Sequence, residues 1–491
     1  MNESDHVGDQ LSHNPPARTF VGSALAGDSQ EPDRWGERLP RSLGPGSAIA
    51  VLVGSTIGSG IFRSPAVVAQ DLQSVGPFAL AWVLGGLVAL AGALTFAELG
   101  AMFPRTGGIY VYLREAFGEL PAFLFGWAEL LILRPAAYGA IAITSAEYTW
   151  RLLGHDPGRP LWQVIDVIDG GLTISLAQGL AAVFIVFVGI VNYRGVRLGA
   201  VIQNVSTVLK VAAILALVLL GLALVPDALP AVEQLPERSP NAPEPGSLAA
   251  FGLAMVAVLW AYDGWSDVGF VGGEIRDPAR NLPRAFIAGT AVVVGLYLLV
   301  DFVYLRVVPL EQMPGRPLIA ADVAEALIGP LGAALVAGAV AISTFGTLNG
   351  SMMTGPRVFF AMAEDDLFFR RLARVHPVHK TPGGAIVLSM ILGVVFVSFQ
   401  GFAELADQFV IGIWPFYALA VAAVLVLRRR RPELERPYKT FGYPFVPLAF
   451  LLAALYLLGN YAVRETDKFV LDVAIVLSGV PVFWVWRRRR G

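Results

Sequence analysis

The stretch Gly54-Ser55-Thr56-Ile57-Gly58-Ser59-Gly60 interrupts the first long apolar segment of the chain. Six of its seven residues are glycine, serine or threonine, whereas the residues on both sides are typical of a membrane-spanning helix. In lipid, an unpaired backbone N–H or C=O group is costly, so such a break persists only where protein, water or a ligand satisfies the freed groups. The stretch therefore predicts a membrane protein with an irregular, functional backbone segment at its centre.

The composition agrees with a membrane protein. The chain has 491 residues, of which 55% are hydrophobic and 15% charged, whereas a soluble protein carries about 25% charged residues. The chain has no cysteine, which excludes disulfides, thiolate catalysis and cysteine metal sites. All five histidines lie outside the apolar runs. We therefore expect no metal site and no cofactor.

Twelve apolar segments are long enough to be read as helices that cross a membrane. Their approximate ranges are 45–70, 77–103, 120–149, 172–192, 198–225, 248–274, 285–307, 331–361, 383–400, 403–427, 443–463 and 468–486. Residues 1–42 are polar and without apolar periodicity, which predicts a disordered tail rather than a signal peptide. Residues 226–247 are rich in proline and glutamate and predict an irregular linker.

Lysine and arginine predict the orientation. With the N-terminus inside, the loops on the cytoplasmic side hold these residues in a ratio of roughly three to one over the outer loops. We therefore expect both termini in the cytoplasm. The stretch 104–110 predicts a short helix between segments 2 and 3. Residues 320–327 predict another in an outer loop, which can either act as a lid or be an inert surface loop.

A second break lies at Trp260-Ala261-Tyr262-Asp263-Gly264-Trp265, inside the sixth apolar segment. Two interrupted helices at matching places in two halves of a chain indicate the binding site of a transporter. At the first break, the N–H groups of Gly58, Ser59 and Gly60 begin a half-helix, whose partial positive charge suits a carboxylate. The alternative for these residues is close helix packing through small side chains.

The second break has three features that bear on a ligand. Carbonyl groups near Trp260 and Ala261 can accept hydrogen bonds from an ammonium group, and the Trp260 ring can close over a ligand. A carboxylate at the depth of Asp263 needs a cation or a water-filled cavity. Asp263 can thus pair with a substrate, pair with a protein cation or titrate, and Asp267 can share its cavity.

Lys210 lies in the middle of segment 198–225, too deep to reach water easily. Its ammonium can satisfy carbonyl groups released by the first break, or it can change protonation. A purely structural contact with those carbonyl groups is the alternative. Ser343, Thr344 and Thr347 are candidate hydroxyl partners for Lys210 or for the substrate. We expect Glu129 and Arg134 to pair structurally, and Pro135 to kink their helix.

Several motifs of this chain resemble those of the L-type amino acid transporter (LAT) family of the amino acid–polyamine–organocation superfamily. The resemblance runs in order from about residue 45 to 487. The motifs are Gly58-Ser59-Gly60-Ile61-Phe62, Ala97-Glu98-Leu99-Gly100, Thr106-Gly107-Gly108-Ile109-Tyr110, Glu129-Leu130-Leu131-Ile132-Leu133-Arg134-Pro135, Tyr262-Asp263-Gly264-Trp265, Asn281-Leu282-Pro283-Arg284-Ala285, Phe345-Gly346-Thr347-Leu348-Asn349-Gly350 and Arg431-Pro432-Glu433-Leu434-Glu435-Arg436-Pro437.

The resemblance implies an all-α membrane protein of twelve transmembrane helices, with a LeuT-like 5+5 inverted repeat and broken helices 1 and 6. Residues 43–225 would form the first repeat, 248–427 the second, and 428–491 a basic loop and the last two helices. The amino acid's carboxylate would bind the N–H groups of Ser59 and Gly60. Its amine would bind carbonyl groups of Thr56, Trp260 and Ala261.

The full set of substrate-binding candidates covers both breaks. It comprises Thr56, Ile57, Gly58, Ser59, Gly60, Trp260, Ala261, Tyr262, Asp263 and Gly264. Lys210 matches the family's lysine at the place where sodium binds in sodium-coupled relatives, so the resemblance implies sodium independence. We assign Lys210 and Ser343 to coupling.

Two departures from the family pattern bear on partner and substrate. Eukaryotic members use a cysteine after the third helix to bond a glycoprotein partner, and the loop Gly154-His155-Asp156-Pro157 has none. We therefore expect no disulfide-linked heavy chain, and a bacterial-type transporter in the inner membrane. The position of Asp263 is glycine in members selective for large neutral amino acids. Asp occurs in members that accept cationic ones and in bacterial members with small neutral substrates, so the substrate stays open.

We expect a sodium-independent L-amino acid exchanger that works by alternating access, because a fixed Lys210 charge removes the need for a driving ion. A proton-coupled amino acid or polyamine symporter is the alternative within the class, and a non-transporting amino acid sensor is the alternative outside it. We expect no enzyme, because the chain shows no catalytic cluster and no phosphate-binding loop. The expected partners are the amino acid and membrane lipid, not nucleic acid.

Overall fold

The computed structural model describes residues 39–165, 172–224, 243–316 and 318–488. The predicted tail up to residue 38, and the predicted linker up to residue 242, lie outside these residues. The first half contains α1 (Pro45–Thr56), α2 (Gly60–Asp71), α3 (Val75–Met102), α4 (Ile109–Phe117), α5 (Glu119–Ala128), the π-helix η1 (Glu129–Leu133), α6 (Arg134–Leu152), β1 (Pro160–Ile165), β2 (Leu172–Ser175), α7 (Leu176–Arg194) and α8 (Val196–Ala223).

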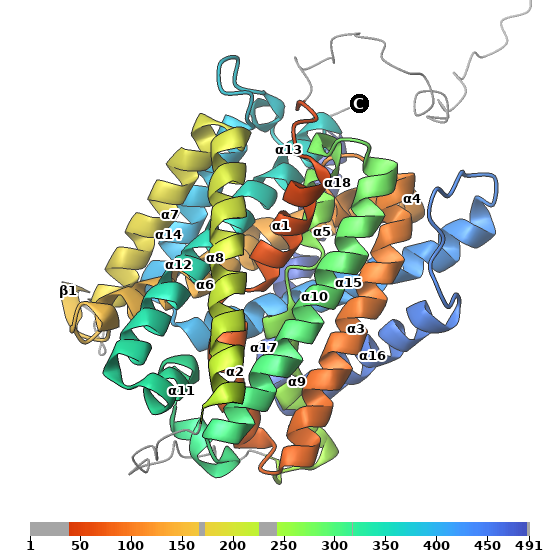
Figure 1. Ribbon diagram of the computed structural model, residues 1–491. Coiled ribbons are helices and arrows are strands. Elements are labelled where there is room, and N and C mark those ends of the chain that lie inside the picture. The colour runs from red at the N-terminus through yellow and green to blue at the C-terminus, as the bar shows by residue number, and fades with distance from the viewer. Residues whose placement is uncertain (1–38, 166–171, 225–242, 317, 489–491) are drawn as a thin grey trace, which may run out of the picture. The chain divides into compact units, whose positions relative to one another are not determined.

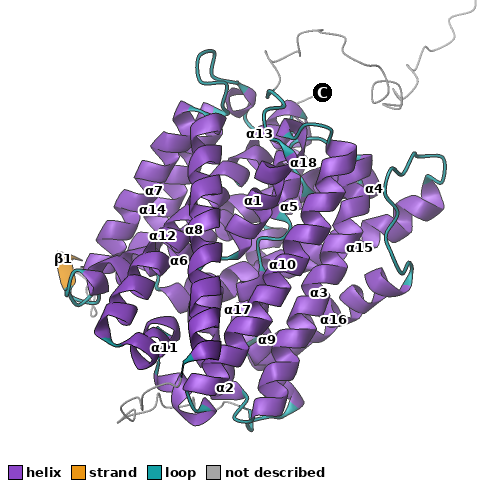
Figure 2. Ribbon diagram, in the orientation of Figure 1, coloured by secondary structure: helices purple, strands orange, loops and turns teal. Residues whose placement is uncertain are grey.

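The second half begins with an interrupted helix, as the first half does with α1 and α2. Its elements are α9 (Leu248–Tyr262), the 3₁₀ helix η2 (Asp267–Glu274), α10 (Pro278–Val307), η3 (Leu310–Gly315), α11 (Ile319–Ile328), α12 (Pro330–Thr354), α13 (Pro356–Glu364), η4 (Arg370–Ala373), α14 (Gly383–Phe399), α15 (Phe402–Arg430), α16 (Phe445–Arg464), α17 (Thr466–Leu477) and α18 (Gly479–Arg488). Figure 2 shows that helix makes up nearly all of the bundle, with β1 at its edge.

Within the described residues, eleven helical stretches are long and apolar enough to cross a membrane, and α14 is a shorter apolar helix. Five of the eleven stretches join two or more elements: α1 with α2, α9 with η2, α12 with α13, and α17 with α18 each form one span, and α5, η1 and α6 form another. The chain is therefore an all-α, multi-pass membrane protein.

The two interrupted spans lie at the centre of the bundle. In Figure 1, α1 occupies the upper part of the view, and α2 and α9 lie below it. Helix α10 packs along α3 and α1, while α12 packs along α6 and α8. Small residues allow this close packing: a methyl group added to Gly85 or Gly86 would overlap Val258 or Val294. The breaks are thus enclosed by α3, α6, α8, α10 and α12.

Two short helices predicted between spans are confirmed. Helix α4 follows Gly107 and Gly108, whose positive φ angles of 119° and 50° turn the chain into the helix. Helix α11 covers residues 319–328, close to the predicted range. One boundary was wrong, because residues 172–175 pair with β1 instead of starting a helix. The helix starts at Leu176, where Ser175 and Gln178 form a capping box.

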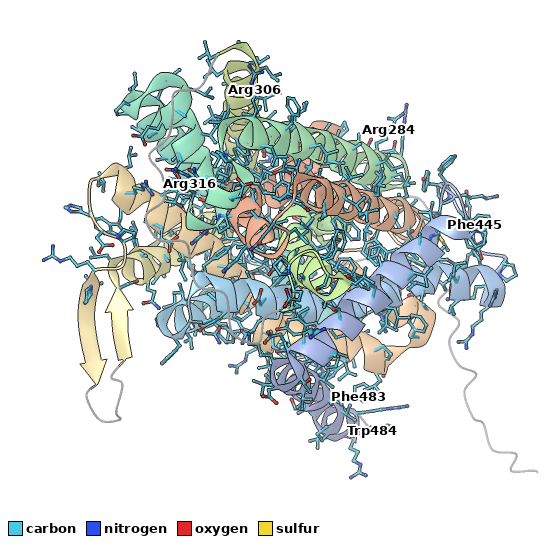
Figure 3. The ribbon with its side chains drawn as sticks, turned by 90° about the horizontal axis from the view of Figure 1, so that it is seen from below. Arg284, Arg306, Arg316, Phe445, Phe483 and Trp484 are labelled. Carbon is cyan, nitrogen blue, oxygen red and sulfur yellow. The ribbon has the colours of Figure 1, made fainter. Side chains whose placement is uncertain are left out.

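Large apolar side chains cover the outside of the bundle. Phe445 is 78% exposed and Trp484 is 48% exposed, and Figure 3 shows both at the edge of the molecule seen from below. Such a surface would be unfavourable in water and suits contact with lipid tails.

Candidate functional site

The first break leaves carbonyl groups that α8 and α12 satisfy. Helix α1 ends at Thr56, Ile57 has non-helical angles, and α2 starts at Gly60. The Nζ atom of Lys210 donates to the carbonyl oxygens of Gly54 at 2.8 Å and Ile57 at 2.7 Å.

Thr347 of α12 completes this contact. Its hydroxyl lies 2.9 Å from the Nζ atom of Lys210 and 2.8 Å from the carbonyl oxygen of Ile57. Ser343, one turn earlier, donates to the same carbonyl at 3.4 Å, and Thr344 bonds its own helix. Lys210 is 2% exposed. Its charge therefore lies among backbone carbonyl groups behind the first break.

The second break depends on Gly264. Helix α9 ends at Tyr262, Asp263 is extended, and Gly264 has a φ angle of 104°. A methyl group on Gly264 would lie 2.8 Å from the carbonyl carbon of Ser55 and from the amide nitrogen of Thr56. The turn thus needs glycine both for its backbone angle and for its close approach to α1.

The two breaks are joined directly. The indole N–H of Trp260 donates to the hydroxyl of Ser59 at 3.3 Å. The hydroxyl of Tyr297, on α10, donates to the carbonyl oxygen of Thr56 at 2.9 Å. Movement of either interrupted helix must therefore change contacts of the other.

A cavity of about 40 Å³ lies between the breaks, which is enough space for a few water molecules. It is lined by Ser55, Thr56, Gly58, Ser59, Gly60, Arg134, Ala137, Ile141, Trp260, Asp263, Gly264, Asp267, Thr347, Ser351 and Phe409. Of the predicted substrate residues, Ile57, Ala261 and Tyr262 belong to the breaks but not to this lining. Lys210 and Ser343 line a separate apolar pocket on the other side of the first break.

Six lining residues were not predicted for the site, namely Ser55, Arg134, Ala137, Ile141, Ser351 and Phe409, and of these Arg134 is charged. It pairs with Glu129 at 2.5 Å, as predicted, and also with Asp267 at 3.5 Å. The π-helix η1 comprises the five residues Glu129–Leu133, and its wide turn places Arg134 one turn after Glu129. The two carboxylates therefore compensate the one guanidinium.

Asp263 has a different kind of partner. Its Oδ1 atom accepts a hydrogen bond from the hydroxyl of Tyr417 at 2.7 Å, and that hydroxyl also lies 3.0 Å from the hydroxyl of Ser266. Among the ion pairs of the described residues, none includes Asp263. The cavity thus contains a carboxylate that is hydrogen-bonded but not neutralised by a protein cation.

Aromatic rings close one side of the cavity. The Trp260 ring meets Phe402 and Phe409 edge-on, with ring centroids 6.0 and 5.6 Å apart. The Arg63 guanidinium lies 4.1 Å from the centre of the Phe402 ring, and Arg63 pairs with Glu147 at 2.6 Å. A substrate that enters from this side must displace the ring of Trp260 or its neighbours.

Helix α11 lies beyond this aromatic closure. Its Asp322 stands between Arg316 and Arg151, at 3.7 and 3.9 Å. Burial raises the pKa of Asp322 above its ordinary value, although both arginines oppose this effect.

Ion pairs close the opposite side. Arg357 and Glu274 are fully buried and pair at 2.9 Å. Nearer the surface, Asp365 accepts contacts from Arg114 at 2.6 Å and Tyr110 at 3.0 Å. Burial and the charge of Asp365 raise the pKa of Tyr110 well above its ordinary value. The cavity is therefore separated from both faces of the protein.

A family model described as "Amino acid permease" matches residues 43–484. The chain is 30% identical to the serine/threonine exchanger SteT of Bacillus subtilis (strain 168), over 92% of this chain and 98% of that protein. It is 32% identical to the human b(0,+)-type amino acid transporter 1, over 93% and 90%. It is 30% identical to the human large neutral amino acids transporter small subunit 2, over 92% and 81%.

Proposed function

The chain belongs to the amino acid permease family, as a LAT-type member of the amino acid–polyamine–organocation superfamily, and on this premise we propose that it exchanges L-amino acids across a membrane by alternating access. The observation that carries the proposal is the cavity between the two touching breaks, closed by aromatic rings on one side and ion pairs on the other. Relatives named as an exchanger and as amino acid transporters support the same function, and their names describe transport rather than catalysis.

The backbone of the first break would hold the substrate's carboxylate. Ser59 and Gly60 start α2, where the helix dipole and free N–H groups favour an anion. The ammonium would bind carbonyl groups of Thr56, Trp260 and Ala261. Two of these already accept hydrogen bonds, from Tyr297 at 2.9 Å and from the amide of Asp263 at 3.2 Å. Binding of the ammonium would therefore rearrange both breaks, which is the link that alternating access requires.

Lys210 would replace a coupling cation. Its ammonium bonds Gly54 and Ile57 and so supplies a fixed positive charge at the first break. A transporter with such a charge needs no sodium ion at this place. This supports sodium-independent exchange, with Ser343 and Thr347 as the hydroxyl partners of the site.

Asp263 would select the side chain of the substrate. Arg134 is compensated by Glu129 and Asp267, whereas Asp263 lines the cavity, accepts a hydrogen bond from the phenol of Tyr417 and is in no ion pair among the described residues. The cationic side chain of an amino acid would neutralise the charge of this carboxylate. We therefore place cationic amino acids among the substrates.

The architecture would follow the 5+5 inverted repeat with twelve helices. Each proposed repeat, 43–225 and 248–427, begins with an interrupted span, and residues 428–491 would add a basic loop and the last two helices. The excess of lysine and arginine on one side supports cytoplasmic termini. Without cysteine the chain cannot form a disulfide with a heavy chain, which supports a transporter that works alone in a bacterial inner membrane.

Radiolabelled amino acid uptake into proteoliposomes tests the proposal. Vesicles would be loaded with unlabelled amino acids or left empty, with and without a proton gradient and sodium. We expect uptake only into loaded vesicles and no effect of sodium. Uptake into empty vesicles that follows the proton gradient would instead establish symport, and binding without any flux would establish a sensor.

A further inference from the structure

Asp301 is a buried carboxylate outside the proposed substrate cavity. It lies on α10 and is 4% exposed. Within the part of the chain that the structure describes, neither of its carboxylate oxygens has a hydrogen-bond partner. The hydroxyl of Tyr304, three residues later, is also buried without a partner there. An unpaired, ionised carboxylate in such a place is strongly unfavourable.

The buried and half-buried charged groups on the elements around α10 are engaged elsewhere, and Arg197 of α8 and Glu325 of α11 are exposed. Lys210 of α8 lies on carbonyl groups of the first break, Arg63 of α2 pairs with Glu147, Asp322 of α11 stands between Arg151 and Arg316, Glu98 of α3 pairs with Arg428, and Asp267 and Glu274 of η2 pair with Arg134 and Arg357. Arg306, near the end of α10, donates to the carbonyl of Leu222 and is seen at the edge of the bundle in Figure 3. No cation of the described residues is thus in contact with Asp301.

Two phenols neighbour Asp301 along its own helix. Tyr297 lies four residues before it and Tyr304 three residues after it on α10, so each is about one helical turn away. Tyr262 ends α9 at the second break, and its ring packs against Tyr297 with centroids 5.2 Å apart. Tyr297 precedes Asp301 by one helical turn, which places both side chains on one face of α10.

Tyr297 connects Asp301 to the first break. Its hydroxyl donates to the carbonyl oxygen of Thr56 in the described conformation. A phenol has one proton to donate. A negatively charged Asp301 is the stronger acceptor, since hydrogen bonds to ionised groups are about twice as strong as those between neutral groups. The Thr56 carbonyl also accepts from the amide of Gly58 at 2.8 Å. Ionisation of Asp301 would therefore draw the hydroxyl of Tyr297 away from Thr56 and free the second acceptor position of that carbonyl.

We propose that Asp301 binds a proton, and that this proton is released when an amino acid binds at the first break. The O–H bond of the carboxylic acid breaks, its electron pair stays on Asp301, and the proton passes to water. Tyr297 then donates to the carboxylate, and the carbonyl of Thr56 accepts the substrate's ammonium. The inference rests on the proposed function, because it takes Thr56 as a partner of the ammonium. By linkage, the proton and the amino acid lower each other's affinity.

Titration calorimetry of the purified protein tests this inference. L-arginine, L-serine and L-leucine would each be titrated in buffers of different ionisation enthalpy between pH 5 and 8, which counts the protons released. For the wild type we expect up to one proton released per amino acid bound, and an affinity that rises with pH by up to tenfold per unit. For Asp301→Asn we expect binding to remain, without proton release and without pH dependence.

Two further variants keep the test decisive. Tyr297→Phe retains the carboxyl group but removes the hydroxyl that links it to Thr56, and we expect its affinity to lose most of the pH dependence. This result decides the question if Asp301→Asn does not fold. The control Asp322→Asn changes an acidic residue of α11 that has arginine partners, and we expect its proton release to match the wild type.

Four outcomes overturn the inference. Proton release that survives in Asp301→Asn but is lost in Asp263→Asn assigns the proton to Asp263. Binding that requires sodium or lithium in the wild type but not in Asp301→Asn makes Asp301 a metal-cation site. Binding of an amino acid without proton release would contradict the inference but not the proposed function. Failure of all three amino acids to bind would contradict both.

Discussion

A methyl group added to Gly60 would overlap the Cα and Cβ atoms of Ala261, so the two interrupted helices touch through their backbones. Gly264 makes the reciprocal contact with Ser55 and Thr56. These two glycines therefore allow the breaks to touch. The cavity lies between the breaks, next to this contact.

Gly60→Ala should abolish amino acid exchange, because the Ala261 backbone cannot yield without separating the breaks. The measurement is exchange in proteoliposomes, normalised to folded protein. Gly295→Ala is the matched control: a methyl group there meets no atom within 4 Å, and alanine favours a helix by about 1 kcal/mol. Full exchange by Gly60→Ala would show that the breaks do not need this contact.

Lys210→Met should lower both thermal stability and transport. The variant keeps the length of the side chain but removes the cation from the carbonyl groups of Gly54 and Ile57, which keep only hydroxyl partners. Loss of a hydrogen bond from a charged group costs about 1.5–3 kcal/mol. Thermal unfolding in detergent and exchange in proteoliposomes would both be measured. Lys468→Met, at an exposed position on α17, is the control. Transport and stability equal to wild type without added ions would contradict a role of Lys210 in replacing an ion.

Asp263→Gly should change the choice of side chain. Loss of a hydrogen bond to a charged group costs about 1.5–3 kcal/mol, so the ratio of arginine to leucine uptake should fall about 10- to 100-fold. Tyr417→Phe removes the phenol that holds Asp263 and should shift the ratio less. An unchanged ratio in Asp263→Gly would mean that Asp263 does not contact the substrate side chain.

Amino acid methyl esters should fail to compete for uptake. The ester removes the negative charge that the N-terminus of α2 would bind at Ser59 and Gly60. Competition by L-leucine and its methyl ester against labelled L-leucine measures this directly. Equal competition would exclude Ser59 and Gly60 as the carboxylate site.

Asp322 should make stability depend on pH. Because its pKa is raised in the folded protein, the folded state holds a proton that the unfolded state has released. The contribution to stability is present below the unfolded pKa and declines as pH rises through the folded one. The difference in melting temperature between wild type and Asp322→Asn should therefore fall as the pH rises above about 4, the ordinary pKa of an aspartate. A constant difference would show that burial does not perturb this carboxyl.

The sequence by itself determined the class of protein, the position of nearly every span and the two breaks. These features follow from local properties, because a run of about 20 apolar residues has one favourable environment and a cluster of glycines inside it is costly in lipid. Lys210 was predictable for the same reason: a charge ten residues inside an apolar segment has to find polar groups of the protein.

The tertiary structure decided which side chains line the cavity. Arg134 and Phe409 enter it from α6 and α15, while Ile57, Ala261 and Tyr262 belong to the breaks but do not line it. The boundary between β2 and α7 at Leu176 also emerged only from the fold, as did the lack of a hydrogen-bond partner for the Asp301 carboxylate among the described residues. Which side chains come into contact depends on which helices approach each other and on how each helix is rotated about its axis. That choice is made by the packing of residues far apart in the chain, and a local pattern carries no information about it.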